Sequence, residues 1–305
     1  SSTRLHRCAP TAKHRPAVER LSGALVATSS LMGASLAAGL KDSAYSGSVI
    51  GWGRRDEVRE AAERSGWFDS VTADAAAAVA GADLVVFCLP VKAIGEAVLA
   101  LVDDFKVGAV ITDVGSTKLA LGEVLGTRLA AGSVSFVGSH PICGSEKSGF
   151  GAADACLYRD RLTVVCPGDS EVAMARVSAL WACVGSEVVE MGAREHDVLL
   201  ASASHLPHMV AALVVRAVAG EPDAIDFCGT GFRDTTRVAS GSSAVWADIM
   251  ESNREVLGGT LVRFQDELSG LLRLLDSGSH AEMEAWLAEA AAQRDEMVDN
   301  SRYLD

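Results

Sequence analysis

Short apolar runs that alternate with helical patterns are the feature that most constrains the fold. The runs predict buried strands at residues 23–27, 48–52, 83–90 and 107–113. Between them, the spacing of small and apolar residues predicts helices at 33–40, 56–65, 73–80 and 92–103. Strands that alternate with helices are typical of a parallel, doubly wound α/β sheet. Further along, we expect two strands at 162–166 and 187–190, with a helix at 170–184 between them.

The predicted secondary structure changes after Gly192. Strand-like alternation ends there, and long helices are predicted at residues 193–219, 242–276 and 280–299. We therefore place an α/β domain at 21–192 and an all-helical C-terminal domain at 193–305. Alanine- and leucine-rich faces in the second domain exceed what one small bundle needs to bury. We expect it to pack against a copy of itself and form a homodimer.

The first twenty residues have a different character again. They carry five lysines and arginines against a single acid, Glu19, and show no apolar periodicity. Such a stretch is typical of a disordered basic arm, so we assign residues 1–20 to one. Two origins stay open, an ordinary flexible leader and the remnant of an organellar targeting peptide.

Charge and composition narrow the class of partner. A net charge of −13 disfavours nucleic acid or an anionic membrane as the main ligand, although it allows a local basic pocket for a small anion. No apolar run reaches the roughly 20 residues that cross a bilayer. The seven cysteines show no paired, metal-finger spacing. We expect a cytoplasmic protein that acts on a small molecule.

A dinucleotide fingerprint belongs at the first strand–turn–helix, but it is incomplete. With Gly33 as the third glycine of GxGxxG, Thr28 and Ser30 occupy the first two positions. In one interpretation their hydroxyls bind the phosphates, and the helix start at Leu31, Met32 and Gly33 supplies amide donors. In the other, the side chain of Ser30 crowds the pyrophosphate, and cofactor binding is weakened or lost.

The end of the second strand bears on the choice of cofactor. Gly53 stands where an acid would bind the ribose of NAD, and Arg54 and Arg55 follow it. Guanidinium groups without the acid favour the 2′-phosphate of NADP, with NAD still possible. The alternative is an ordinary solvated basic turn. At the end of the third strand, Leu89 and Pro90 complete the predicted cofactor site.

The stretch from Gly138 to Gly151 contains the main catalytic candidate. An apolar run at 134–137 leads into His140, and Pro141 should end the strand because it cannot donate to a sheet. We therefore expect His140 in a loop past a strand end, where catalytic groups are common. The alternative is a polar surface loop that happens to contain a histidine.

Three other stretches carry candidate side chains. Ser116 and Lys118 follow the fourth strand, where ligands bind in parallel sheets, although the same stretch could simply cap a helix. His205 lies on one helical face with His208, beside a kink expected at Pro207. No third ligand accompanies these histidines, so we expect no metal. A polar loop is predicted at 231–240, with two arginines suited to gripping carboxylates, Arg233 and Arg237.

Together these motifs resemble one family, the prephenate and arogenate dehydrogenases of tyrosine biosynthesis. The resemblance covers residues 22–276 and is carried by the stretches 113–118, 140–149, 204–208 and 231–237. It implies a Rossmann-like nucleotide domain followed by a helical domain, with a nicotinamide cofactor. The departures are Thr28, Ser30 and Gly53, which bear on cofactor affinity and choice.

The resemblance also implies roles for the candidate side chains. His140 would accept the 4-hydroxyl proton of prephenate or arogenate while hydride leaves C4 and CO2 departs, and Ser116 would bind the same hydroxyl. Arg237 would bind a substrate carboxylate in a pocket lined by His205. Further substrate-binding candidates are Lys118, Glu146 and Arg233. Two rivals stay open: a catalytically silent binding protein of the same fold, and a dehydrogenase for another hydroxy acid.

Overall fold

The computed structural model describes residues 25–28, 30–43, 45–129, 134–143 and 149–301. The chain divides after Arg254 into two compact units, which are treated separately below. The basic arm expected at residues 1–20 and the candidate Glu146 lie outside the described residues. The domain boundary expected at residue 192 stays a prediction, because the division after Arg254 rests on compactness alone.

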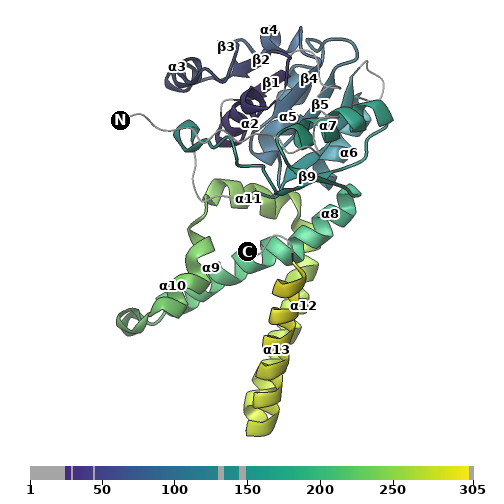
Figure 1. Ribbon diagram of the computed structural model, residues 1–305. Helices are drawn as coiled ribbons and strands as arrows, with labels where there is room; N and C mark the ends of the chain where they lie inside the picture. The colour runs from purple at the N-terminus through teal and green to yellow at the C-terminus, as the bar shows by residue number, and fades with distance from the viewer. Residues whose placement is uncertain (1–24, 29, 44, 130–133, 144–148, 302–305) are drawn as a thin grey trace. The chain divides into compact units, whose positions relative to one another are not determined.

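A six-stranded parallel sheet forms the centre of the first unit (Figure 1). Its strands, in the spatial order β3-β2-β1-β4-β5-β6, are β1 (Leu25–Thr28), β2 (Val49–Trp52), β3 (Ser70–Thr72), β4 (Leu84–Phe87), β5 (Val110–Asp113) and β6 (Ser135–Val137). Every neighbouring pair is parallel. The order reverses between β1 and β4, so the crevice at their carboxyl ends is where a doubly wound sheet binds its ligand. The predicted α/β fold is confirmed.

Helices cover both faces of this sheet. They are α2 (Leu31–Asp42), α3 (Asp56–Ser65), α4 (Ala75–Val79), α5 (Val91–Ala100), α6 (Leu119–Leu129) and α7 (Glu171–Cys183). Alternate residues of β4 enter different cores, because successive strand side chains point to opposite faces. Leu84 and Val86 pack in one core with α2 and α7. Val85 and Phe87 pack in the other with α4, α5 and α6.

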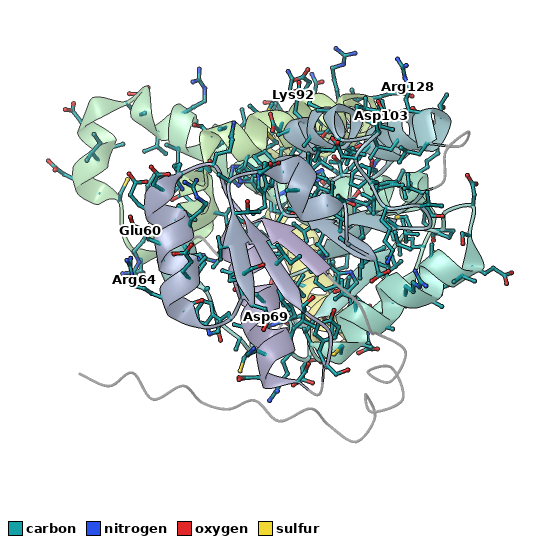
Figure 2. All side chains as sticks on the ribbon, turned by 90° about the horizontal axis from the view of Figure 1, so that it is seen from above. Glu60, Arg64, Asp69, Lys92, Asp103 and Arg128 are labelled. Carbon is teal, nitrogen blue, oxygen red and sulfur yellow. The ribbon has the colours of Figure 1, made fainter. Side chains whose placement is uncertain are left out.

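Charged side chains lie on the outside of these helices and turns (Figure 2). Glu60 and Arg64 pair one helical turn apart on α3, with both side chains more than half exposed. Asp69 is also exposed, and one of its oxygens accepts from the backbone N–H of Val49 at 2.8 Å. These charged side chains are thus solvated at the surface, while apolar side chains make up the two cores between the sheet and its helices.

A second, three-stranded sheet follows, and it corrects the expected position of His140. Its strands are β7 (Ser139–Pro141), β8 (Leu162–Val165) and β9 (Glu187–Glu190), in that order. The strands expected at 162–166 and 187–190 are present as β8 and β9, and they belong to this separate sheet. His140 was expected in a loop, but it lies within β7 and pairs antiparallel with Val164. Pro141 is the last residue of β7, as its missing N–H predicts.

The long helix expected at 193–219 is interrupted by a wide turn. It consists of α8 (Ala193–Leu200), a π-helical turn η2 (Ala201–His205) and α9 (Leu206–Ala219). The N–H of Leu206 donates to the carbonyl of Ala201, five residues back. Pro207 follows this turn and has no N–H to donate, so the kink expected there takes the form of a π turn.

This segment also corrects the expectation that no apolar run is long enough to cross a bilayer. From Ala193 to Ala219 it passes that test by length and composition, with 22% of its most apolar window buried. The large buried side chains of this segment are polar, since His196, Asp197 and His205 are each at most 1% exposed. The segment thus buries polar side chains and exposes apolar ones such as Val198, Leu199 and Leu213.

The region after α9 was expected to be a loop and then one helix, and both expectations are wrong. The predicted loop at 231–240 is helical, with α10 (Thr230–Thr236) and a 3-10 turn η4 (Arg237–Ser240) after another 3-10 turn, η3 (Pro222–Phe227). The helix predicted at 242–276 is split into α11 (Ser243–Ser252) and α12 (Arg254–Ser277). Asn253 breaks it with φ −112° and ψ 27°, outside helical values.

The second unit is built from α12 and α13 (His280–Asn300), close to the predicted helix at 280–299. Gly278 joins the two helices at φ 65°, a left-handed conformation that suits glycine. The hydroxyl of Ser279 then caps α13 by accepting from the N–H of Glu282 at 3.4 Å. Large apolar side chains on this unit are exposed, including Val262, Leu268, Leu272, Leu275, Leu287 and Met297.

Candidate active site

A cavity of about 290 Å³ opens at the carboxyl ends of the strands, where the sheet order reverses. It is lined by the start of α2, by the turns after β4 and β5, and by one face of α11. Six residues expected at the cofactor or catalytic site line it: Ser30, Leu31, Met32, Leu89, Pro90 and Ser116. The sequence therefore placed these side chains around one cavity, at the position that the topology favours for a nucleotide.

Ser30 does two things at the altered glycine loop. It is the N-cap of α2, and its hydroxyl oxygen accepts from the N–H of Gly33 at 3.2 Å. As an acceptor in that bond, the hydroxyl still has its own hydrogen to donate. Gly33 is buried under the helix start, while Thr28 is the last residue of β1 and pairs with Trp52. This geometry fits the interpretation in which a hydroxyl replaces a glycine at the phosphates.

The turn after β2 is held by an arginine that the sequence did not single out. One nitrogen of Arg59 donates to the carbonyls of Gly53 and Arg54, at 2.9 Å each, and Arg59 also pairs with Asp56. The side chains of Arg54 and Arg55 are exposed, and none of the three turn residues 53–55 is among those that line the cavity. The two predicted guanidinium groups thus stand on a fixed turn at the edge of the sheet.

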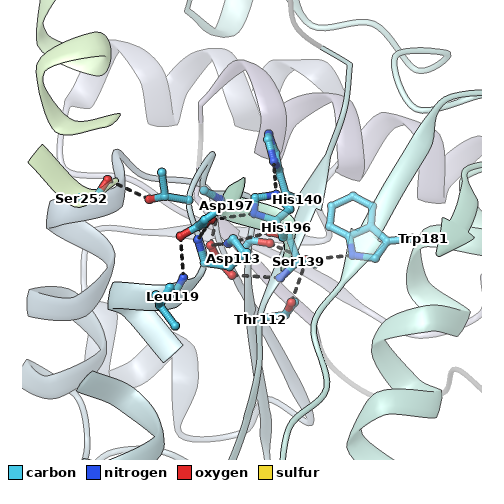
Figure 3. Close-up of polar contacts among 12 residues, drawn as sticks. Thr112, Asp113, Leu119, Ser139, His140, Trp181, His196, Asp197 and Ser252 are labelled. Atoms are coloured by element: carbon cyan, nitrogen blue, oxygen red, sulfur yellow. Dashed lines mark hydrogen bonds and ion pairs between the residues drawn. The ribbon is translucent and has the colours of Figure 1, made fainter. Parts of the chain in front are cut away.

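His140 is the first member of a chain of three side chains (Figure 3). Its Nδ1 lies 2.8 Å from Nε2 of His196, and Nδ1 of His196 lies 2.7 Å from Oδ1 of Asp197. His196 and Asp197 come from α8 and are almost completely buried. The His140 ring is partly buried and meets His196 edge-on. The arrangement couples a candidate base to a buried carboxylate.

Asp197 also fixes the start of α6. Its carboxylate accepts from the backbone N–H of Lys118 at 2.8 Å and of Leu119 at 3.0 Å. The sequence left open that the stretch around Ser116 caps that helix, and the two N–H groups at its start instead donate to a carboxylate from α8. Asn253 extends the network by donating to the carbonyl of Asp197 at 2.9 Å, and it lies 3.3 Å from Nδ1 of His205.

The electrostatic surroundings keep His140 neutral. Burial of its ring, with like-charge repulsion from His196, Lys118 and His205, holds the pKa of His140 well below its usual value. Burial lowers the pKa of His205 to about 4, against an opposing attraction from Asp197. A neutral imidazole can accept a proton, as a general base must.

Lys118 supports the strand that carries His140. Its ammonium forms an ion pair with Asp113 and donates to the carbonyl of Ser139 at 2.9 Å. Asp113 in turn accepts from the N–H of Ser139 at 3.0 Å, so both groups hold the residue before His140. The side chains of Lys118 and Asp113 are 1% and 0% exposed. These contacts are structural, and they lend no support to the predicted role of Lys118 in substrate binding.

The two predicted arginines lie elsewhere. Arg233, on α10, pairs with its neighbour Asp234 at 3.1 Å and is largely exposed. Arg237 begins η4 and is also exposed. Neither contributes to the contacts of His140 described above or lines the cavity, so their substrate-binding roles stay predictions. Within the described part of the chain, no group of three or more acidic, histidine or cysteine side chains could hold a metal ion.

Sequence reasoning missed the second half of this site. It did not single out His196, Asp197 or Asn253, and it missed Trp246, whose ring stacks on His208 at 3.5 Å between centroids. One signal was available. Charged or polar residues at positions 196, 197, 205 and 208 interrupt an otherwise apolar helix, and buried polar residues are costly unless they have partners.

Comparison with known proteins gives a consistent result. Residues 36–190 match the family model described as prephenate dehydrogenase, nucleotide-binding domain, and residues 192–289 match prephenate dehydrogenase, dimerization domain. The chain is 32% identical over 249 residues to the cyclohexadienyl dehydrogenase of Zymomonas mobilis, covering 79% of this chain and 84% of that protein.

Solved structures of the same kind are also similar. The prephenate dehydrogenase of Aquifex aeolicus, in complex with hydroxyphenyl propionate and NAD+, aligns with a TM-score of 0.84 and 28% identity. That alignment covers 91% of this chain and 98% of that one. The arogenate dehydrogenase of Synechocystis aligns with a TM-score of 0.78 and 27% identity, covering 91% and 100%.

Proposed function

Because the chain belongs to the prephenate dehydrogenase family, we propose that it catalyses the oxidative decarboxylation of prephenate or arogenate, with a nicotinamide cofactor, in tyrosine biosynthesis. The single observation that carries this proposal is the neutral imidazole of His140, hydrogen-bonded into a buried chain of polar side chains. The stretch from Asp113 to Lys118 links this histidine to the cavity, since Ser116 lines the cavity and Lys118 holds Ser139.

In the proposed reaction, His140 takes the proton of the substrate 4-hydroxyl as that oxygen becomes a carbonyl. A bound nicotinamide would accept the hydride that leaves C4. Loss of CO2 returns the electrons of the broken C–C bond to the ring, and the C4 oxygen takes the proton back from His140 to become a phenol, so aromatisation drives the step. The protein's own part is to orient the hydroxyl, with Ser116 at the cavity wall, and to hold the proton on His140.

The family uses a nicotinamide dinucleotide as its cofactor, and for this chain we propose NADP. The start of α2 lines the cavity, and Ser30 keeps a hydroxyl hydrogen there for a phosphate oxygen. Exposed Arg54 and Arg55 on the turn after β2, with no acid at position 53, favour a 2′-phosphate. NAD is the alternative.

For the substrate, we propose that Arg237 binds a carboxylate and that His205 lines the pocket. Because His205 is nearly fully buried and its Nδ1 meets Asn253, its ring orientation is fixed before substrate binds. Arg233, Lys118 and Glu146 remain further candidates. Lys118 has the weakest support of these, given its contacts with Asp113 and Ser139.

We further propose that the active form is a homodimer built by the helical region. The matched model of residues 192–289 is described as a dimerization domain. The apolar residues exposed on α12 and α13 are the kind of surface that a second copy covers. A sedimentation equilibrium run in which the chain has its monomer mass at micromolar concentration would contradict this.

The test of the proposed function is a reduced-nicotinamide absorbance assay of prephenate and arogenate, each with NADP and NAD. At least one combination should turn over, and His140→Asn should lower kcat by about 10²–10⁴-fold with little change in KM. Wild-type protein that binds nucleotide in calorimetry but turns over neither substrate would instead support the silent binding protein.

A further inference from the structure

The three side chains His140, His196 and Asp197 form hydrogen bonds whose direction can be worked out. An ionised carboxylate only accepts, and Asp197 already accepts from two backbone N–H groups at the start of α6. The 2.7 Å contact therefore places a hydrogen on Nδ1 of His196. In neutral His196 the other nitrogen, Nε2, then carries a lone pair.

The lone pair on Nε2 of His196 determines which nitrogen of His140 carries a hydrogen. Nε2 of His196 lies 2.8 Å from Nδ1 of His140, and a lone pair at that distance needs a donor. Nδ1 of His140 must therefore carry the hydrogen. With both rings neutral, Nε2 of His140 is left with the lone pair and is the nitrogen that can accept a proton.

We propose that His196 and Asp197 are positioning residues that fix His140 as its Nδ1–H tautomer, so that Nε2 is the atom that receives the substrate proton. This inference rests on the proposed function of His140 as the base. The hydrogen bond made by one ring nitrogen decides the state of the other, and here that bond ends on a buried carboxylate.

The hydrogen-bonded side chains of His196 and Asp197 also stabilise the positive charge that develops on His140 in the reaction. When Nε2 of His140 takes the proton, the ring becomes a cation in surroundings that already hold the Lys118 ammonium, itself paired with Asp113. His205 faces the ring from the π turn, and His196 faces it from α8. Asp197 is the remaining negative group in this network, and it reaches His140 through His196.

The strand β7 by itself does not fix the orientation or the tautomer of the His140 ring. Pairing of β7 with β8 fixes the backbone of His140 opposite Val164, but it leaves the ring free to rotate and to exchange its proton between nitrogens. Among the described residues, the ring has one hydrogen-bond partner, His196. The orientation and tautomer of the base therefore depend on a residue 56 positions later in the chain.

Nitrogen-15 NMR of histidine-labelled protein tests the tautomer directly and needs no turnover. Two-bond proton–nitrogen spectra distinguish Nδ1–H from Nε2–H imidazoles, and loss of one set of signals in His140→Asn assigns this ring. We expect the Nδ1–H pattern for His140 in the wild type. An Nε2–H pattern would overturn the proposal.

Two substitutions at position 196 separate positioning from simple structural support. His196→Leu removes the acceptor and should lower kcat by roughly 10²-fold, shift the acid limb of the kcat/KM profile and leave a mixture of His140 tautomers. His196→Gln keeps an amide oxygen near the position of Nε2 and should restore the Nδ1–H pattern and part of the lost kcat. The proposal would be overturned if kcat fell equally in the two variants and the His140 tautomer were unchanged in both.

The outcome also separates this inference from the proposed function. An Nδ1–H tautomer that is lost in His196→Leu supports the positioning role even if neither prephenate nor arogenate turns over. Turnover of one substrate with an Nε2–H tautomer supports the dehydrogenase and contradicts the positioning role. His280→Gln, at an exposed histidine of α13, is the matched control and should change neither readout.

Discussion

The buried ion pair between Lys118 and Asp113 gives the sharpest stability prediction. In Lys118→Met the apolar stem of the side chain is kept and the ammonium is lost. Asp113, whose side chain is 0% exposed, is then left as a buried carboxylate without its counter-ion, and the Ser139 carbonyl loses a donor. Removing one partner of a buried pair costs about 3–5 kcal/mol of unfolding free energy, because the remaining charge stays desolvated.

An exposed pair in the same unit supplies the control. Lys106 and Asp83 are 2.6 Å apart, but their side chains are 45% and 34% exposed. Lys106→Met should therefore cost less than about 1 kcal/mol, since water solvates the carboxylate that is left. The difference between the two variants isolates the effect of burial, because the substitution is the same.

Urea unfolding, followed by far-ultraviolet circular dichroism at one fixed protein concentration, measures both costs. The double variant Lys118→Met with Asp113→Asn should recover part of the loss, because no uncompensated charge remains. It cannot recover all of it, because an amide has one acceptor oxygen for the N–H groups of Gly115 and Ser139. The reasoning is refuted if Lys118→Met costs no more than Lys106→Met.

Three further predictions concern pH, cofactor and substrate. Since burial lowers the pKa of His205 from 6.5 to about 4, the unfolded chain binds a proton in that range that the folded chain does not. Stability should rise between pH 4 and 6.5 by up to about 3 kcal/mol, and His205→Gln should flatten urea-derived stabilities over that window. Gly53→Asp should shift the kcat/KM preference toward NAD; an unaltered ratio of the two cofactors would contradict the proposed role of the turn. Arg237→Gln should raise KM more than it lowers kcat, and a fall in kcat alone in steady-state assays would contradict carboxylate binding.

The parallel sheet could be predicted from the sequence because its signal is local. The central strands β4 and β5 are buried on both faces, so they appear as continuous apolar runs, and the cavity-lining residues follow from where those runs end. The resemblance to the prephenate dehydrogenases rested on the same strand ends and was confirmed by the family match.

What could not be predicted depends on contacts between distant residues. The strand β7 contains Ser139, His140 and Pro141, none of which favours a strand, and it exists because it pairs with β8. In the same way, nothing local indicates that Asp197 caps α6 or that His196 meets His140. The helix α10 was missed because glycine and threonine are poor helix formers, and its last turn is closed when Thr236 donates to the Phe232 carbonyl.

The π turn at Ala201–His205 decides where the helix from α8 to α9 can lose a residue without loss of the site geometry. Successive residues of an α-helix differ by about 100° in direction around the axis. The wide turn holds one residue more than an α turn, so deleting one residue there and closing it as an ordinary α turn would leave α8 and α9 close to their present rotation. A one-residue deletion in α8 between His196 and this turn would instead rotate His196 by about 100° around the helix axis, and the hydrogen bond to His140 would be lost although both histidines remain in the sequence.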